Sequence, residues 1–176
     1  DGATGRGIAN LPPSINDQLK ELSTMAKRYG GIHAVSGTLG SGASGSVRLA
    51  LLRIIFKSVD LPEQYPVARF VMWLKNEDIY ETVRRQVEEN GYNWQEELDN
   101  FYVAEGLHGA LVQAKPNLFS SPLECAETLR NQYSKVQDVS NDEMLKTIRQ
   151  ALNKNGNFPL TLIALDEVQQ YIGEDG

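Results

Sequence analysis

The feature that most restricts the fold of this chain is a short apolar run near its C-terminal end. Leu160 to Leu165 is apolar except for one Thr, which predicts a strand buried on both faces, as in parallel sheets. The run ends in two adjacent carboxylates, Asp166 and Glu167. Because the ligand sites of open α/β sheets lie at the carboxyl ends of strands, we expect these two acids at a site where chemistry takes place.

An apolar strand followed by Asp-Glu resembles the Walker B pattern of P-loop ATPases. In that pattern the Asp holds Mg²⁺, usually through water, and the Glu polarises the water that attacks the γ-phosphate. The resemblance therefore implies a metal-binding role for Asp166 and a catalytic role for Glu167. The alternative is structural: Asp166 caps a helix that begins at Glu167, since acids are favoured at helix starts in any case.

Composition and charge narrow the class of protein. A hydrophobic fraction of 41% in 176 residues is enough for a sizeable core. The net charge of −6 argues against nonspecific binding of the whole chain to nucleic acid or to an anionic membrane. The single cysteine, Cys125, excludes an internal disulfide and predicts a reducing, cytoplasmic setting. No apolar stretch has the length of a membrane span, so no membrane contact is expected.

Helical periodicity dominates the rest of the chain, so we expect an α/β fold that is mostly helical with a small parallel sheet. Residues 1–13 are expected to be a flexible lead-in and residues 174–176 a tail. A helix capped by Ser14 is predicted up to Gly30-Gly31, followed by a strand at 32–35. A further helix is expected from Val47 to about Val59 with Ser46 as its cap, and another from Val67 to Lys75, although residues 70–74 also fit a strand. Asn76 is predicted to cap a helix that runs through Val87, and Asn93 is predicted to cap the next one. Three more helices are expected at about 104–114, at 122–133 and after Asn141.

A glycine- and serine-rich loop predicted from Ser36 to Gly45 is the second feature that suggests chemistry. It has the outline of a Walker A loop, Gly-x-x-x-x-Gly-Lys-Ser, between a strand and a helix, but Ala43 stands at the lysine position. Backbone N–H groups can still cradle phosphate there, yet the cation that holds the β- and γ-phosphates is missing. The residues that would line such a weak nucleotide-binding cradle are Gly37, Gly40, Gly42 and Ser44.

The same glycines also fit a dinucleotide fingerprint, Gly-x-Gly-x-x-Gly, at Gly40, Gly42 and Gly45. A true fingerprint needs a second strand that ends in an acid about twenty residues later. Asp60 stands near that distance, but it begins the loop Asp60-Leu-Pro-Glu-Gln-Tyr-Pro66 and no strand is predicted before it. A flexible glycine loop between strand and helix is the simplest of the three interpretations.

Other candidate groups do not form a recognisable pattern. His33, His108 and Cys125 are far apart in the sequence, so no metal-ligand spacing is present, and His33 is expected to be a hydrogen-bonded strand residue. The aromatic side chains of the middle segment recur at helical spacing, which is typical of a core. The pair Arg84-Arg85 is too small a basic patch to indicate DNA binding.

Three segments together resemble the large P-loop ATPases of prokaryotic phage-defence systems, of the BREX (phage growth limitation) type. The segments are Tyr29-Gly-Gly-Ile-His-Ala-Val-Ser-Gly-Thr-Leu-Gly-Ser-Gly42, the Asp60–Pro66 loop, and Leu160-Thr-Leu-Ile-Ala-Leu-Asp-Glu-Val-Gln-Gln-Tyr-Ile-Gly173. In that family a lysine-bearing Walker A lies upstream, and a helix, a strand and a helical insertion lead to the Walker B. The resemblance implies that residues 14–173 are part of a P-loop, AAA+-like ATPase domain with a helical insertion at about 66–153.

The resemblance also implies cofactors and partners. ATP and Mg²⁺ would be bound by the intact parent protein, whereas this chain alone would bind neither tightly and would be inactive. The partners would be the rest of the parent ATPase, a second copy of the chain and other defence-system proteins, because two strands are too few for a nucleotide-binding sheet. A non-catalytic helical interaction domain is the alternative, and a dinucleotide-binding domain is the third interpretation.

Overall fold

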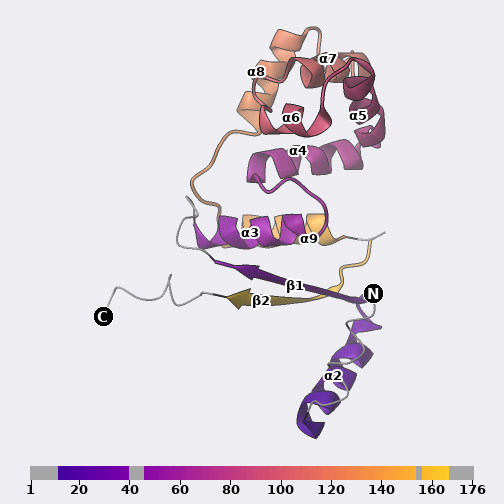
Figure 1. Cartoon of the computed structure of the whole chain (residues 1–176), viewed down its shortest axis with the longest axis vertical. Coiled ribbons are helices and arrows are strands. Elements are labelled where there is room, and N and C mark those ends of the chain that lie inside the picture. The colour runs from indigo at the N-terminus through magenta and orange to yellow at the C-terminus, as the bar shows by residue number, and fades with distance from the viewer. Residues whose placement is uncertain (1–11, 40–45, 154–155, 167–176) are drawn as a thin grey trace, which may run out of the picture.

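A computed structural model describes residues 12–39, 46–153 and 156–166 of the chain. The molecule is mostly helical, with a small parallel sheet at one end of a helical body (Figure 1), which confirms the expected α/β character. No helix in these three ranges is long and apolar enough to cross a membrane. In chain order the elements are α2 (Pro13–Ala26), β1 (Ile32–Thr38), α3 (Val47–Lys57), α4 (Tyr65–Asn76), α5 (Tyr80–Glu89), α6 (Trp94–Asp99), α7 (Glu105–Ala114), α8 (Pro122–Gln132), α9 (Asn141–Leu152) and β2 (Leu160–Asp166).

The two strands pair in parallel from end to end. Ile32 lies opposite Leu160 and Thr38 lies opposite Asp166. The predicted strand at 32–35 is therefore too short, and the prediction that the loop begins at Ser36 is wrong. The reason is that β2 offers a ladder partner to every residue up to Thr38, which keeps the chain extended despite a glycine that weakens strands.

Only one face of the sheet is covered among the described residues. Helices α3 and α9 lie over that face (Figure 1), and Val35 and Ile163 point into the core there. On the other face Ile32 is 50% exposed and Leu162 is 55% exposed. The prediction of a strand buried on both faces is thus wrong for these residues, because α2 extends away from the sheet on that side (Figure 1).

Side-chain caps explain where several helices begin. Ser46 accepts a hydrogen bond from Leu49 N at 3.3 Å, and Asn93 accepts from the backbone of Gln95 at 2.9 Å, so both predicted caps are confirmed. Ser121 and Ser140 cap α8 and α9 in the same way.

Two predicted caps are wrong. Helix α2 begins at Pro13, one residue before Ser14, and it has no side-chain cap. Asn76 is the last residue of α4, which is helical throughout, including residues 70–74. Asp78 then adopts a left-handed conformation with φ of 56°, and Ile79 N donates to Leu74 O at 3.0 Å. This is the geometry that ends a helix, so the next helix, α5, starts only at Tyr80.

The core lies mainly in the helices between the two strands. Phe70, Phe101 and Tyr133 form an aromatic cluster, with 4.9 Å between the ring centroids of Phe70 and Phe101. Helices α4 to α9 run from Tyr65 to Leu152, which agrees with the extent of the helical segment predicted at about 66–153. That this segment is an insertion in a larger domain stays a prediction.

Candidate functional site

Asp166 lies at the carboxyl end of β2, directly opposite Thr38 at the end of β1. Leu39 N donates to Asp166 O at 3.1 Å, which extends the pairing one residue past β1. In a parallel pair, opposed residues point to the same face, so the Thr38 hydroxyl and the Asp166 carboxylate stand side by side on the open face. Both side chains are exposed. The two strands therefore end at one edge of the sheet, as the sequence predicts.

The described residues on either side of the glycine-rich segment, Leu39 and Ser46, lie at this same end of the sheet. Leu39, which precedes it, is only 2% exposed and packs against Ala50 and Ile54 of α3. Ser46, which follows it, caps α3, and the start of α3 lies at the end of the sheet to which both strands point (Figure 1). The predicted site residues Gly40, Gly42, Ser44 and Glu167 lie outside the described residues.

Gly37 lies within β1, on the face covered by α3. A Cβ atom at this position would stand 2.6 Å from both Cγ1 and Cδ1 of Ile54. Carbon atoms in contact normally lie about 3.5–4.0 Å apart, so only glycine lets α3 approach the strand this closely. Close packing thus explains why position 37 is a glycine without any nucleotide binding. Contact of Gly37 with phosphate stays a prediction.

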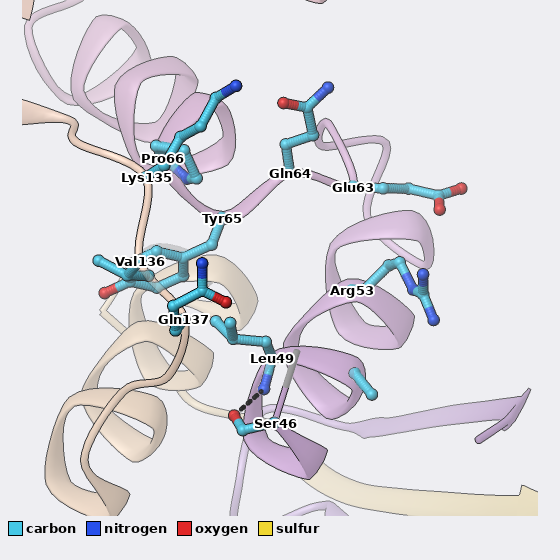
Figure 2. Close-up of a pocket in the computed structure, with 11 residues that line it drawn as sticks. Ser46, Leu49, Arg53, Glu63, Gln64, Tyr65, Pro66, Lys135, Val136 and Gln137 are labelled. Carbon is cyan, nitrogen blue, oxygen red and sulfur yellow. Dashed lines mark hydrogen bonds between the residues drawn. The ribbon is translucent and has the colours of Figure 1, made fainter. Parts of the chain in front are cut away.

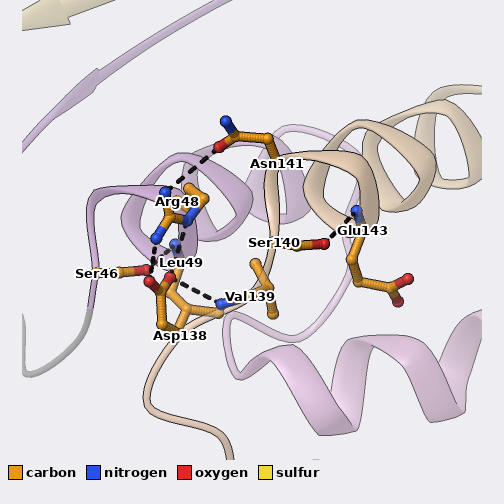
Figure 3. A network of polar contacts seen from close by, with 8 residues as sticks. All are labelled: Ser46, Arg48, Leu49, Asp138, Val139, Ser140, Asn141 and Glu143. Atoms are coloured by element: carbon orange, nitrogen blue, oxygen red, sulfur yellow. Dashed lines mark hydrogen bonds and ion pairs between the residues drawn. The ribbon is translucent and has the colours of Figure 1, made fainter.

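A polar network fixes the start of α3 (Figure 3). Arg48 Nε donates to Asp138 Oδ1 at 3.0 Å, Arg48 Nη2 contacts Asp138 Oδ2, and Arg48 Nη1 donates to Asn141 Oδ1 at 3.4 Å. Hydrogen bonds from Arg48 and then Ser46 hold the pKa of the Asp138 carboxyl well below its ordinary value. The network ties the end of the glycine-rich segment to the residues that precede α9.

Sequence reasoning misses this network and also misses Thr38. Arg48 and Asp138 are 90 positions apart, and neither residue belongs to a motif, so no local signal links them. The sequence pattern puts Thr38 in a loop, and its position opposite Asp166 follows only from the strand register.

The geometry at Asp166 fits a magnesium ion held through water. Mg²⁺ keeps several of its waters and needs only one or two carboxylates, so a single exposed carboxylate at a strand end is sufficient. The ranges that the structure describes contain no group of three or more His, Cys, Asp or Glu side chains that could hold a metal directly. Mg²⁺ binding by Asp166 stays a prediction, and Thr38 is the hydroxyl nearest to Asp166 in the register.

The remaining candidate groups have structural surroundings, and two of them, His108 and Cys125, are buried. His33 Nε2 lies 2.8 Å from Ser58 Oγ, which agrees with its expected role as a hydrogen-bonded strand residue. His108 is buried, contacts Phe101 O at 3.1 Å, and has its pKa lowered by that burial. Burial raises the pKa of the Cys125 thiol to about 12.

The dinucleotide interpretation lacks its second strand. The residues before Asp60 form helix α3, and no strand occurs anywhere in residues 46–153. Comparison of the chain with protein-family models, with curated proteins and with solved structures finds no match. Any assignment of function therefore rests on the residues and the geometry described above.

Proposed function

We propose that this chain contributes the Walker B segment of a P-loop ATPase of the phage-defence type. Asp166 would hold Mg²⁺ through water, and Glu167 would polarise the water that attacks the γ-phosphate of ATP. The observation that carries the proposal is the parallel pairing of β1 with β2, because it puts Asp166 at the carboxyl edge where α/β sheets bind ligands.

The order of the elements supports the same function. A helix, a strand, a helical segment and an acid-tipped strand follow one another as α2, β1, α3 to α9, and β2. This is the order that the resemblance to the phage-defence ATPases implies. Ala43 stands where a Walker A loop has its lysine, so the cation that holds the phosphates would come from elsewhere in the parent protein.

In this proposal Asp166 would contribute to magnesium binding and Glu167 would contribute to proton transfer. Bound Mg²⁺ supplies charge neutralisation at the phosphates. Asp166 would orient a water of the magnesium shell, and the pairing of β2 with β1 holds the backbone from which its carboxylate projects. Glu167 would accept a proton from the attacking water, which requires the carboxylate to be ionised.

Substitution of the two acids in the intact parent protein tests the proposal. Glu167→Gln keeps the shape of the side chain but removes its basicity, so ATP turnover should fall by orders of magnitude while nucleotide binding is retained. Asp166→Asn should weaken the dependence of binding on Mg²⁺. Glu81→Gln, on the distant helix α5, is the matched control. If Glu167→Gln leaves ATP turnover unchanged, the Asp166-Glu167 pair has no catalytic role and is simply the start of a helix.

The chain alone offers a second test. Because the Walker A lysine is absent, ATP·Mg²⁺ should bind with a dissociation constant no tighter than about 1 mM, or about −4 kcal/mol. Isothermal titration calorimetry measures this directly. Submicromolar binding would contradict the proposal and make the glycine-rich segment a phosphate site in its own right.

A non-catalytic interaction domain is the second candidate, and exposed apolar side chains on the helical body favour it. Val103 is 65% exposed, Leu118 is 56% exposed and Leu123 is 69% exposed. If the chain functions by binding a partner through such side chains, Leu123→Lys should abolish partner binding, whereas Glu167→Gln should leave ATP turnover and partner binding unchanged. The opposite pair of results supports the ATPase.

A further inference from the structure

Two apolar surfaces on the same side of the molecule lack a covering element among the described residues. One is the open face of the sheet, on the side of β1 and β2 that faces away from α3 and α9 (Figure 1). The other is one face of α2, which extends away from the sheet on that same side (Figure 1). We refer to α2 below as the arm.

The open face is free of charged side chains along most of its length. Because the strands pair in parallel, opposed residues share a face, and alternate residues of each strand point to it. Its residues are Ile32, Ala34, Ser36 and Thr38 from β1 and Leu160, Leu162, Ala164 and Asp166 from β2. The only charged residue among them is Asp166, at the end. With Leu162 55% exposed and Ile32 50% exposed, this face suits an apolar partner.

The arm carries a matching apolar stripe. Ile15, Leu19, Leu22 and Ala26 recur at the spacing of one helix face. Ile15 is 40% exposed and Leu19 is 41% exposed, and no other described element packs extensively against the arm. A helix of 14 residues without a side-chain cap is marginal in water unless its apolar face is packed. The stripe therefore needs a partner surface.

Backbone hydrogen bonds hold the arm away from its own sheet. Gly31 N donates to Ala26 O at 2.9 Å, which closes the end of the arm, and Leu160 N donates to Gly31 O at 2.9 Å. A Cβ atom at Gly30 would lie 2.8 Å from Cβ of Asn157, so the link between the arm and β1 also packs closely against the segment before β2. The direction of the arm is thus fixed where the sheet begins, and its stripe stays available to another molecule.

We propose that the arm of one copy of this chain covers the open face of a second copy, and that the exchange is reciprocal. The lengths match, because the 14 residues of the arm extend about 21 Å and the seven residues of β2 extend about 23 Å. A two-fold axis makes the two contacts equivalent, since the same surfaces meet twice in an isologous dimer. Neither nucleotide nor Mg²⁺ takes part, so the dimer does not depend on the proposed ATPase function.

The area of the contact indicates a weak, reversible dimer. A helix about 21 Å long and about 10 Å wide covers about 200 Å² of sheet, so the four surfaces of two contacts lose roughly 800 Å² as a flat projection. Interdigitating side chains bury more than this projection, which brings the dimer to the lower end of the about 1,200–2,000 Å² of specific interfaces. The dissociation constant should therefore lie at roughly 1–100 μM.

A cavity on the other side of α3 lies outside this contact and supplies a control. It has a volume of about 600 Å³ and lies between α3, the start of α4 and the segment that joins α8 to α9 (Figure 2). Val136 lines it and is 37% exposed. Because α3 covers the opposite face of the sheet, Val136→Lys adds a charge to an exposed apolar side chain away from the proposed contact.

Sedimentation equilibrium of the chain at concentrations up to about 1 mM tests the proposal. We expect a monomer–dimer equilibrium. Leu162→Lys on the open face and Leu19→Glu on the arm should each weaken it at least about tenfold, because each puts a charge into both apolar contacts. Val136→Lys should leave the dissociation constant unchanged. The Leu162 and Leu19 side chains are exposed, and Glu is a good helix former, so neither variant puts the fold at risk.

A mixture of the two variants makes the test specific for an exchange of arms. In the mixed dimer the intact arm of the Leu162→Lys variant meets the intact face of the Leu19→Glu variant, and opposite charges face each other in the second contact. The mixture should therefore dimerise about tenfold more tightly than either variant alone. A chain that stays monomeric at about 1 mM would overturn the proposal. So would unimpaired dimerisation of Leu19→Glu, since the faces would then meet without the arm, or a mixture no tighter than its components.

Discussion

Replacement of Gly37 by alanine should destabilise the protein through a single steric contact. The new Cβ would meet two carbon atoms of Ile54 at 2.6 Å, about 1 Å closer than carbon atoms normally pack. Neither side can yield easily, because β1 is held in a ladder with β2 and Ile54 is 9% exposed within α3. Overpacking of this kind costs about 1–3 kcal/mol. Alanine also restricts the unfolded chain more than glycine does, which favours the folded state by about 0.4–1 kcal/mol. The net loss in the free energy of unfolding should therefore be about 1–2 kcal/mol.

Urea unfolding of four variants isolates this contact. Gly109→Ala is the matched control, because Gly109 lies inside α7 and a methyl group added there would meet no neighbouring atom within 4 Å, so it should gain about 0.5–1 kcal/mol. Ile54→Ala alone should lose about 2–4 kcal/mol through the cavity it leaves. In that background the clashing atoms are gone, so Gly37→Ala should keep only the gain of about 0.4–1 kcal/mol from the unfolded state. The coupling between the two sites should therefore be about 1–3 kcal/mol.

Two results would refute the reasoning. A gain in stability for Gly37→Ala, like that expected for Gly109→Ala, would show that α3 does not press on the strand. An equal loss in the presence and absence of the Ile54 side chain would show that the cost arises elsewhere. If Gly37→Ala instead leaves the free energy of unfolding unchanged but weakens nucleotide binding in the parent protein, the glycine is needed for contact with phosphate and not for packing.

Three further outcomes are expected. The pKa of Cys125, raised to about 12 by burial, should make the native thiol unreactive toward iodoacetamide at pH 8, whereas labelling at the rate of a free thiol would contradict its burial. Because the pKa of Asp138 is depressed, its pair with Arg48 stabilises the fold above the ordinary value of 3.8 and loses this effect as the pH falls through the folded pKa. Asp138→Asn should thus be less stable than the wild type at neutral pH, with a difference in urea midpoint that shrinks in acid; a constant difference would exclude the ion pair as its cause. Leu162→Lys, on the open face, should change stability by less than about 0.5 kcal/mol and reduce self-association in sedimentation, whereas a large loss of stability would show that this face is covered.

Local patterns are enough to predict most of the helices and the position of Asp166. Capping side chains such as Ser46 and Asn93 act within three residues of the backbone groups they satisfy, so the sequence alone reveals them. The apolar run ending at Leu165 likewise predicts a strand, and a carboxylate that follows it must lie at the strand's carboxyl end.

The features that the sequence predicts wrongly or misses depend on distant partners. Gly37 looks like a loop residue until β2 is known to lie beside it, and Arg48 finds Asp138 only after the helical body has folded. An apolar run indicates that both faces of a strand are suited to burial, but it does not indicate whether the described residues cover both faces. Leu162, which is exposed, shows the difference. Each of these cases needs tertiary information. Asp78 is the exception, because its left-handed conformation belongs to a local helix end, closed by the bond from Ile79 N to Leu74 O, that no motif indicates.

The parallel pairing of β1 with β2 has a consequence for the order of folding. Every bond between the strands joins segments that precede and follow the whole helical body in the sequence. Closing so long a loop of flexible chain is entropically costly and slow. Prior formation of the helical body, in which α9 packs against α3, would shorten the distance that must be closed. During synthesis the edge of β1 that pairs with β2 therefore stays unpaired until β2 has been made. The end of the sheet that carries Asp166 is completed last, so a chain with a fully formed helical body but unpaired strands would not yet have Asp166 beside Thr38.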